Sequence, residues 1–177
     1  MKQFFYSNVI PIRSNITVYK VGSYLFIKGP LGKVFLNLPK IIFFEKTNQG
    51  CRLLGLVENK NLVLTYFKLL SNKFKGVYLG FFEILIINGV GWRVSIQNST
   101  LLFSLGYSHL IKYSLKSDIE VIPYDKQRFK VFGLDLSTVQ RVVADLCKLR
   151  LFNVYKGKGV YKEGQLLKLK ESSKSKA

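Results

Sequence analysis

Short apolar runs rich in β-branched and aromatic residues alternate with glycine, proline and polar positions along the first sixty residues. Runs of this kind are typical of β-strands, and they occupy residues 16–19, 24–28, 34–38 and 52–57. The second and third runs are joined by residues 29–33, where two glycines permit positive φ and a proline fixes φ. We therefore expect a hairpin there, followed by a further strand.

From Asn61 onwards the apolar spacing changes to the period of a helix, with lysines on the other positions. One amphipathic helix is expected, with Gly76 as its C-cap. A second helix is expected from Ser137, which forms a capping-box pattern with Gln140. Between the two helices, six strand-like runs cover residues 82–87, 92–97, 101–105, 111–115, 119–122 and 129–132.

The order of strands, helix, strands, helix suggests an internal duplication. At a constant offset of 77 residues, identical residues coincide at Leu25 and Leu102, Phe26 and Phe103, Gly29 and Gly106, and Leu38 and Leu115. The sequence therefore predicts an α+β fold of two tandem repeated domains, each an antiparallel sheet packed against one helix. We expect the repeats over 1–80 and 81–165. A basic C-terminal extension over 166–177 is expected to be disordered unless a polyanion holds it.

The net charge of the chain indicates the kind of partner that it binds. The 177 residues include 28 Lys or Arg and 10 Asp or Glu, a formal net charge of +18, while 48% of the chain is hydrophobic. These values indicate a folded protein with a polyanionic partner. The longest apolar run is too short to span a bilayer, and no signal or transit peptide is expected at the start. The distant Cys51 and Cys147 are expected to be packing thiols in a reducing compartment.

Residue usage suggests where the gene resides. Residues with A/T-rich codons (Phe, Tyr, Met, Ile, Asn, Lys) number 70, and those with G/C-rich codons (Gly, Ala, Arg, Pro) number 26. Only two alanines occur, although alanine is the best helix former. We therefore expect an A/T-rich genome, which is typical of organelles.

The strongest candidate site follows the second expected helix. Alternating lysine and glycine allow the backbone to approach phosphates closely, and tyrosines can stack on bases or riboses. The alternative reading is a flexible, solvated loop that carries charge by default. The candidate residues are Tyr155, Lys156, Gly157, Lys158, Gly159, Tyr161 and Lys162, with Lys148 and Arg150 at the helix end.

Other polar residues give weaker signals. Arg93 could contact phosphate or be a surface cation, and the neighbouring Trp92 is expected mainly in the core. Ser108 and His109 are adjacent, which does not suit a nucleophile and its base, so a turn that bonds backbone or RNA is favoured. The carboxylates are scattered. We expect no catalytic residue, no metal site, no cofactor and no small-molecule substrate; the sequence does not predict an enzyme.

Five blocks in order resemble the ribosomal protein L6 family of the large ribosomal subunit, over roughly residues 11–162. They are Ile27-Lys28-Gly29-Pro30-Leu31-Gly32, Gly89-Val90-Gly91-Trp92-Arg93, Leu105-Gly106-Tyr107-Ser108-His109, Val142-Val143-Ala144-Asp145-Leu146 and Tyr155-Lys156-Gly157-Lys158-Gly159-Val160. The resemblance implies a structural constituent of the large subunit that binds its rRNA near the sarcin-ricin loop and the stalk base, where elongation factors dock. It also implies contacts with neighbouring large-subunit proteins, and RNA contacts mainly in the second domain, Tyr107 included.

Two other classes of protein remain open from the sequence. One is a non-ribosomal RNA-binding module, such as a processing or regulatory factor. The other is a peripheral membrane protein that uses its cations and aromatic residues on anionic lipid, which is disfavoured because the apolar periods bury those residues in two cores. With the codon bias, a mitochondrial ribosome is the expected location; a plastid or bacterial ribosome is the alternative.

Overall fold

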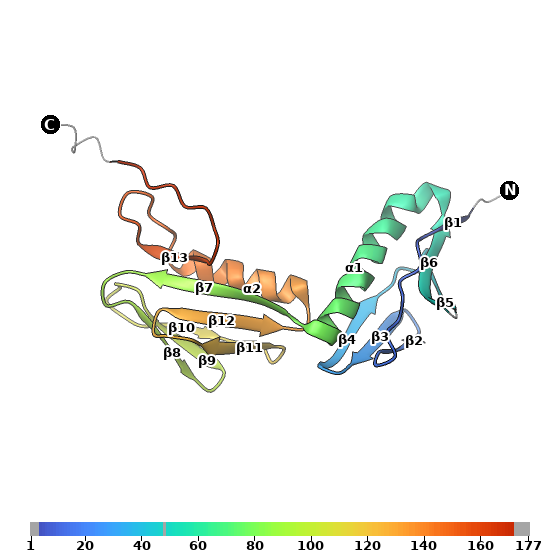
Figure 1. The fold of residues 1–177 in the computed structure, drawn as a ribbon, viewed down its shortest axis with the longest axis horizontal. Coiled ribbons are helices and arrows are strands. Elements are labelled where there is room, and N and C mark those ends of the chain that lie inside the picture. The colour runs from blue at the N-terminus through green and yellow to red at the C-terminus, as the bar shows by residue number, and fades with distance from the viewer. Residues whose placement is uncertain (1–3, 48, 172–177) are drawn as a thin grey trace. The chain divides into compact units, whose positions relative to one another are not determined.

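The computed structural model describes residues 4–47 and 49–171, which fold as two compact units (Figure 1). Unit 1 contains the described residues up to Gly80 together with Leu134–Leu136. Unit 2 contains Phe81–Gly133 and the described residues from Ser137 onwards. Each unit has its own hydrophobic core. The expected α+β fold of antiparallel sheets and two helices is confirmed, with the strands of each unit divided between two sheets.

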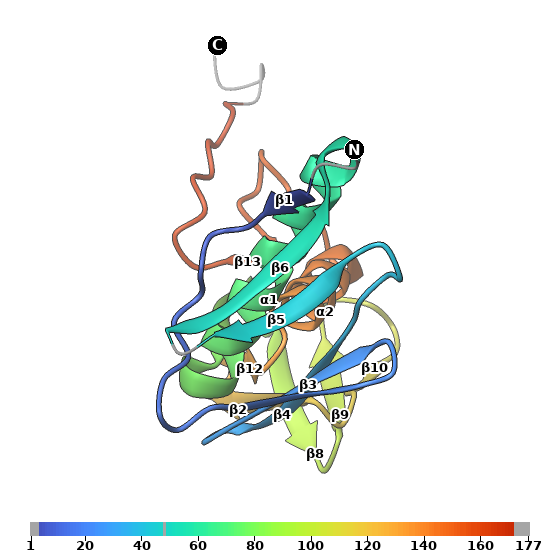
Figure 2. The ribbon, with the colours of Figure 1, turned by 90° about the vertical axis from the view of Figure 1, so that its right-hand side faces the viewer.

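Unit 1 holds two three-stranded antiparallel sheets and one long helix (Figure 2). One sheet has the order β1-β6-β5, and the other has the order β2-β3-β4. Helix α1 packs against β3, β4 and β6, so that it covers both sheets. The elements are β1 (Phe4–Tyr6), β2 (Thr17–Val21), β3 (Tyr24–Gly29), β4 (Gly32–Asn37), β5 (Phe43–Thr47), β6 (Gly50–Leu56), the 3-10 helix Val57–Asn59 and α1 (Lys60–Leu79).

Helix α1 runs one turn further than its sequence predicts. The expected C-cap at Gly76 is wrong, because the helix continues to Leu79 and Gly80 caps it with φ 72°. The Gly80 N–H donates to the Gly76 carbonyl at 2.9 Å. The extra turn completely buries Val77, and this apolar burial offsets the cost of a glycine inside the helix.

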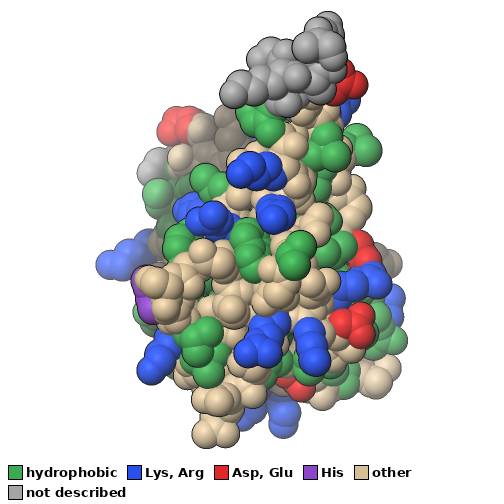
Figure 3. Space-filling view, turned by 90° about the vertical axis from the view of Figure 1, so that its left-hand side faces the viewer, with side chains coloured by type: hydrophobic (Ala, Val, Ile, Leu, Met, Phe, Trp, Pro, Cys, Tyr) green, Lys and Arg blue, Asp and Glu red, His purple; other side chains and the backbone are tan. Residues whose placement is uncertain are grey.

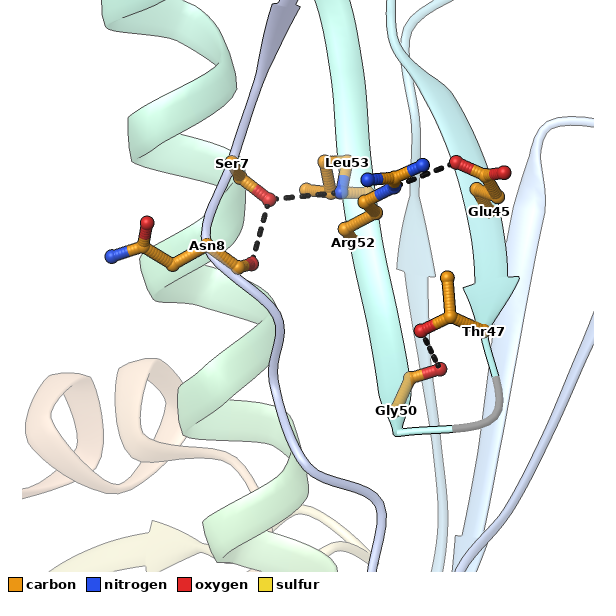
Figure 4. A network of polar contacts seen from close by, with 7 residues as sticks. All are labelled: Ser7, Asn8, Glu45, Thr47, Gly50, Arg52 and Leu53. Atoms are coloured by element: carbon orange, nitrogen blue, oxygen red, sulfur yellow. Dashed lines mark hydrogen bonds and ion pairs between the residues drawn. The ribbon is translucent and has the colours of Figure 1, made fainter.

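A serine continues the pairing of β1 where that strand ends. The Ser7 hydroxyl accepts the Leu53 N–H at 2.9 Å and donates to the Asn8 carbonyl at 3.0 Å (Figure 4). It is the one buried polar side chain among the residues that the structure describes. On the other side of β6, Arg52 pairs with Glu45 directly opposite on β5, at 2.7 Å. Both interactions hold the β1-β6-β5 sheet of unit 1.

Unit 2 has the same kinds of element plus one additional strand. Its sheets have the orders β11-β12-β7-β13 and β10-β9-β8. Helix α2 begins at Leu136, one residue before the expected cap Ser137, and buries one apolar stripe in the core. The elements are β7 (Phe81–Asn88), β8 (Arg93–Gln97), β9 (Thr100–Ser104), β10 (Ile111–Ser114), β11 (Ile119–Pro123), β12 (Arg128–Gly133), α2 (Leu136–Leu149) and β13 (Gly159–Lys162).

The duplication is visible in the topology, element by element. The β1-β6-β5 sheet corresponds to β7-β12-β11, the β2-β3-β4 sheet to β8-β9-β10, and α1 to α2. The constant offset of 77 residues is wrong for the first two strands of the β2-β3-β4 and β8-β9-β10 sheets. There the offset is 76, because Leu25 and Ile27 are fully buried in unit 1 and Leu101 and Phe103 in unit 2. A shift of the alignment by one residue would match the core-facing side chains of one strand with the outward-facing side chains of the other.

The offset changes to 77 only after the turn between the second and third strands. Leu38 donates its N–H to Ser23, and Leu115 donates its N–H to Ser99, both at 2.8 Å, so this pair of leucines is correctly matched. One extra residue therefore lies in the turn of unit 2 before β10. The identities at Leu102 and Phe103 arose from comparing a buried position on one face of the sheet with a partly buried position on the other face.

Candidate nucleic-acid interface

Strand β13 brings the chain that follows α2 back onto the main sheet of unit 2. It pairs antiparallel with β7, on the edge of β7 that β12 does not use. The Val160 N–H donates to the Arg150 carbonyl at 3.0 Å, and the Glu163 N–H donates to the Ile84 carbonyl at 2.9 Å. These bonds fix both ends of β13, so half of the expected phosphate-binding loop is a strand.

The turn before β13 is held by two asparagines. The Asn153 side-chain oxygen accepts the N–H groups of Tyr155 and Lys156 at 2.9 and 3.1 Å. Its own backbone N–H donates to the Lys158 carbonyl at 2.8 Å. From β7, the Asn88 amide donates to the Gly157 carbonyl at 2.8 Å. Side-chain hydrogen bonds therefore define the backbone of the turn, while Tyr155, Lys156 and Lys158 remain exposed.

Glycine is required at positions Gly157 and Gly159 for two different structural reasons. Gly157 has φ 67°, in the left-handed region that favours glycine. A Cβ on Gly159 would lie 2.4 Å from the Phe152 Cα, a backbone atom that cannot swing away. Gly159 is buried, so its small size serves a close approach between two segments of this chain. The close approach gives Gly159 a structural role of its own, and the expected contact of its backbone with phosphate stays a prediction.

A groove opens between this turn, the end of α2 and the turn after β9, with a volume of ≈ 600 Å³. Four cations of the candidate site lie along it, and none of its lining residues is acidic. The lining residues are Trp92, Gly106, Tyr107, Lys148, Leu149, Arg150, Leu151, Asn153, Lys156 and Lys158. The structure thus brings together five residues that the sequence singled out separately: Tyr107, Lys148, Arg150, Lys156 and Lys158.

Arg150 is oriented by two aromatic rings of the groove. Its guanidinium carbon lies 4.7 Å from the Tyr107 ring centroid and 5.6 Å from that of Trp92. The Tyr107 hydroxyl donates to the Leu149 carbonyl at 3.2 Å, which ties the turn after β9 to the end of α2. Cation–π contacts of this kind hold a guanidinium in place while leaving its N–H donors available to an anion.

Trp92 connects the groove to the core. The indole is half-buried and packs against the core cluster of unit 2, as expected from the sequence. It fits because Gly89 and Gly106 have no side chain: a Cβ on Gly89 would lie 2.2 Å, and one on Gly106 2.8 Å, from an indole atom.

The surface of unit 2 mixes cations with apolar side chains. Figure 3 shows Lys and Arg side chains interspersed with hydrophobic ones on this side of the molecule. Such a surface suits phosphates and base rings together.

Comparisons with known proteins agree with this description. The family model described as Ribosomal protein L6 matches residues 88–163, which include the groove and β13. The chain is 33% identical over 176 residues to the large ribosomal subunit protein uL6 of Thermosipho africanus, covering 94% of this chain and 96% of that protein. The chain belongs to the ribosomal protein L6 family. The resemblance read from the five sequence blocks is therefore confirmed.

Two further relatives show how widely this similarity extends. The uL6c protein of Arabidopsis thaliana is 33% identical over 171 residues, covering 94% of this chain and 77% of that protein. The uL6 protein of Mycoplasmoides gallisepticum is 35% identical over 159 residues, covering 87% of each chain. The L6 family consists of structural ribosomal proteins rather than enzymes, as the sequence predicted for this chain.

Several candidate residues of this L6-family chain lie outside the groove. Arg93 lines a separate hollow of ≈ 720 Å³ with Asp125, Lys126 and Arg128. Ser108 and His109 are exposed in the turn after β9, and the His109 ring lies 6.3 Å from that of Tyr107. These two follow the groove residue Tyr107 in the same turn without lining the groove, whereas Arg93 lines the other hollow.

The remaining candidates lie on the turn and on β13. Tyr155 is 60% exposed at the tip of the turn, where its ring is accessible to a partner. Tyr161 packs edge-on against Phe152 at 5.5 Å, which explains its partial burial. Lys162 pairs with Leu85 in the register of β13 and β7. Of the two tyrosines, only Tyr155 has the exposure that base stacking needs.

Other chemistry has little support in the residues that the structure describes. They contain no group of three or more His, Cys, Asp or Glu side chains that could hold a metal ion. No helix among them is long and apolar enough to cross a membrane. Cys51 is buried and Cys147 half-buried, and both are free thiols. Burial raises the pKa of Cys51 to about 11 and also raises the pKa of Cys147, so neither is a reactive thiolate at neutral pH.

Several residues that shape the site were not among those predicted from the sequence. Asn153 and Asn88 fix the turn, and Leu149 and Gly106 place Tyr107 and Trp92 against Arg150. Asn153 had a readable signal, since an asparagine two or three residues before unpaired N–H groups often forms a side-chain turn. Asn88 had none, because its bond to Gly157 spans 69 residues.

Proposed function

We propose that this chain is a structural constituent of the large ribosomal subunit and that unit 2 binds large-subunit rRNA. The observation that carries the proposal is the groove, where Lys148, Arg150, Lys156 and Lys158 converge beside two aromatic rings with no acidic residue in the lining. Relatives at 33% identity over most of the chain are named as large ribosomal subunit proteins, which supports it. Neighbouring large-subunit proteins are its other proposed partners.

The location on the rRNA is the finer part of the proposal. By the resemblance to the L6 family, unit 2 binds near the sarcin-ricin loop and the base of the stalk, close to where elongation factors dock. The RNA-contacting residues proposed are those of the groove together with Ser108, His109 and Tyr155 at its rim, and Lys162 and Arg93 on neighbouring surfaces. Tyr161 and the two glycines contribute by holding the backbone in place.

The compartment is proposed from composition alone. The A/T-biased residue usage favours a mitochondrial ribosome, with a plastid or bacterial ribosome as the alternative. The relatives described above do not include a protein named as mitochondrial. Mapping the gene to a nuclear, organellar or bacterial genome decides between these locations.

The salt dependence of RNA binding tests the groove. Each phosphate contact contributes about −0.7 to −0.9 to the slope of log affinity against log salt. The probe is a transcript of the large-subunit rRNA segment that contains the sarcin-ricin loop and stalk base. We expect Lys156→Ala and Lys158→Ala each to reduce the slope by about one unit, and the exposed Lys46→Ala in unit 1 to leave it unchanged. Unchanged slopes in both groove variants would remove the turn from the interface.

A further inference from the structure

The β2-β3-β4 sheet of unit 1 presents a row of aromatic side chains outward. Tyr19, Phe26 and Phe35 are direct cross-strand neighbours on β2, β3 and β4, and Tyr24 lies beside them. Tyr19 and Phe26 are stacked at 5.3 Å with an interplanar angle of 10°, and Tyr24 meets Phe35 edge-on at 6.0 Å. Tyr19, Tyr24 and Phe35 remain 46–60% exposed. We call these four residues the aromatic row.

The buried side of the same strands shows that this exposure is not an accident of packing. Leu25 and Ile27 of β3 and Leu36 of β4 point into the core of unit 1. The sheet therefore already has an apolar inner face, and the aromatic row forms a second one facing outward. Contiguous exposed apolar surface on a folded protein marks an interaction site more often than scattered single residues do.

Cations lie next to the aromatic row without compensating acids. Lys28 and Lys33 are directly opposite each other on β3 and β4, one row along from Phe26 and Phe35. Like charges at this position destabilise a sheet. None of the nine outward positions on the three strands is acidic, and neither lysine forms a salt bridge within the described part of the chain. This face has the charge pattern of a surface that meets an anion.

Unit 2 provides an internal comparison, because it contains the same three-stranded sheet. The positions that correspond to Tyr19, Phe26 and Phe35 are Ser95, Leu102 and Lys112, which are also direct cross-strand neighbours. The sheet in unit 2 forms without an aromatic row. Cross-strand stabilisation of the fold therefore does not require those rings in unit 1.

We propose that the outward face of the β2-β3-β4 sheet is a binding surface for single-stranded RNA. Unstacked bases lie against the aromatic row, and Lys28 and Lys33 neutralise the adjoining phosphates. Aromatic residues on an open antiparallel sheet with neighbouring cations suit this ligand, because every base has a π-face and every nucleotide carries a negative charge. An acidic protein segment would satisfy the lysines but would leave most of the ring surface unmatched. This face shares no residue with the groove of unit 2, so either proposal can fail alone.

Photocrosslinking of the full chain separates this face from the groove. The probe is a ten-nucleotide oligouridylate, irradiated at 254 nm, with adducts mapped by mass spectrometry after trypsin. Cleavage after Lys20 and Lys28 gives a peptide that carries Tyr24 and Phe26, so the yield of its adduct reports occupancy of this face alone. We expect an adduct on that peptide that saturates with probe concentration.

A double variant then tests the contribution of the rings. The double variant Tyr19→Ser, Phe35→Ser leaves the tryptic peptide with Tyr24 and Phe26 unchanged. Serine is the residue that unit 2 has at Ser95, the position that corresponds to Tyr19. We expect the local dissociation constant to rise about tenfold or more. The control is Phe43→Ser, which removes a 52% exposed ring from the other sheet of unit 1. This substitution should leave the local dissociation constant unchanged. Circular dichroism verifies that both proteins fold.

The salt dependence of RNA affinity, measured from the adduct on the same region of the chain, tests the two lysines. Lys28→Gln and Lys33→Gln together should reduce the local log-salt slope by about 1.4, the value for two phosphate contacts to a single strand. Absence of an adduct at this face, or an unchanged constant in the double serine variant, would overturn the proposal. It would also be overturned if that variant lost affinity only for a fluorescent peptide of alternating Glu and Phe, since the face would then bind protein.

Discussion

The two units of this chain are built on one topology, yet the groove occurs in only one of them. In unit 1, β1 pairs only with β6 among the described strands. In unit 2, the corresponding β7 has eight residues and pairs with both β12 and β13. The segment that leads into β13 supplies Arg150, Lys156 and Lys158. The groove therefore needs the segment added after the repeat, which completes a wall that Trp92, Tyr107 and Lys148 of the repeat itself provide.

Net charge would not have separated the two units. Residues 1–80 contain twelve Lys or Arg and two Glu, whereas residues 81–177 contain sixteen Lys or Arg and eight Asp or Glu. The first half is the more basic of the two by net charge. What distinguishes unit 2 is the convergence of its cations on a concave surface that lacks acids. For an evenly basic protein, the interface has to be located by geometry.

Core truncations are expected to have the largest effects. Phe103 and Ile27 occupy corresponding positions and are both fully buried. We expect Phe103→Ala to lower the free energy of unfolding of unit 2 by about 3–5 kcal/mol and to weaken groove binding. We expect Ile27→Ala to cost unit 1 about 2–5 kcal/mol without changing groove binding. Urea unfolding followed by Trp92 fluorescence reports unit 2. Equal losses of groove binding in both variants would show that the units do not act separately.

Detaching β13 is the next largest change. Gly159→Ala places a Cβ against the Phe152 backbone, and we expect a cost of about 1–3 kcal/mol and faster hydrogen exchange at Val160 and Glu163. Groove binding should weaken with it, because the turn loses its anchor on β7. Gly164→Ala is the matched control: its φ is also positive, at 78°, but a Cβ there meets nothing within 4 Å. If the control weakened groove binding equally, backbone strain rather than β13 would be responsible.

The buried thiol of unit 1 predicts a difference in alkaline stability. Burial raises the pKa of Cys51 to about 11 from 9.0, so the folded state holds a proton that the unfolded state releases. A raised pKa gives stability that is complete below pH 9 and is lost as the pH rises towards 11. We expect the urea midpoint of the wild type to fall more steeply over this window than that of Cys51→Ala. Cys147→Ala, at a half-buried site, should change the slope less; an equal change would contradict this account.

Surface ion pairs should matter least in both units. Arg52 pairs with Glu45 in unit 1 (Figure 4), and Arg128 pairs with Glu163 after β13 in unit 2. All four side chains are at least one-third exposed, so Glu45→Gln and Glu163→Gln should each cost less than about 1 kcal/mol. Denaturation in low and high salt measures this, and the cost should vanish in high salt. A cost above that limit for Glu163 would mean that the pair anchors β13.

Much of the fold could be predicted from local pattern, and the misses have a common cause. Strong alternation or helical spacing identified β3, β4, β9 and both helices. Strands β1 and β13 were missed because their pairing partners are distant in sequence, and β13 reads locally as a glycine-rich loop. The Gly76 cap was wrong because the helix continues to Leu79, and the next residue, Val77, is fully buried in the core. Tertiary contacts decided each of these cases.

The candidate site was predicted in composition but not in arrangement. Lysines and tyrosines near the end of the chain were readable as an anion-binding set. Their assembly with Tyr107 and Trp92 depends on Asn88, Gly89 and Gly106, which lie on other elements. The aromatic row was hidden for a different reason: Tyr19, Phe26 and Phe35 each look like ordinary strand residues, and only the pairing register places them on one outward face.

Crosslinking of the native large subunit tests the central claim most directly. Particles are purified from cells or organelles on a sucrose gradient, washed with salt and irradiated, and the protein–RNA adducts are mapped by mass spectrometry. The account predicts that the chain stays with the large subunit and carries adducts among Tyr107, Lys148, Arg150, Tyr155, Lys156 and Lys158. Recovery of the chain only at the top of the gradient, or adducts that leave the groove untouched, would contradict it.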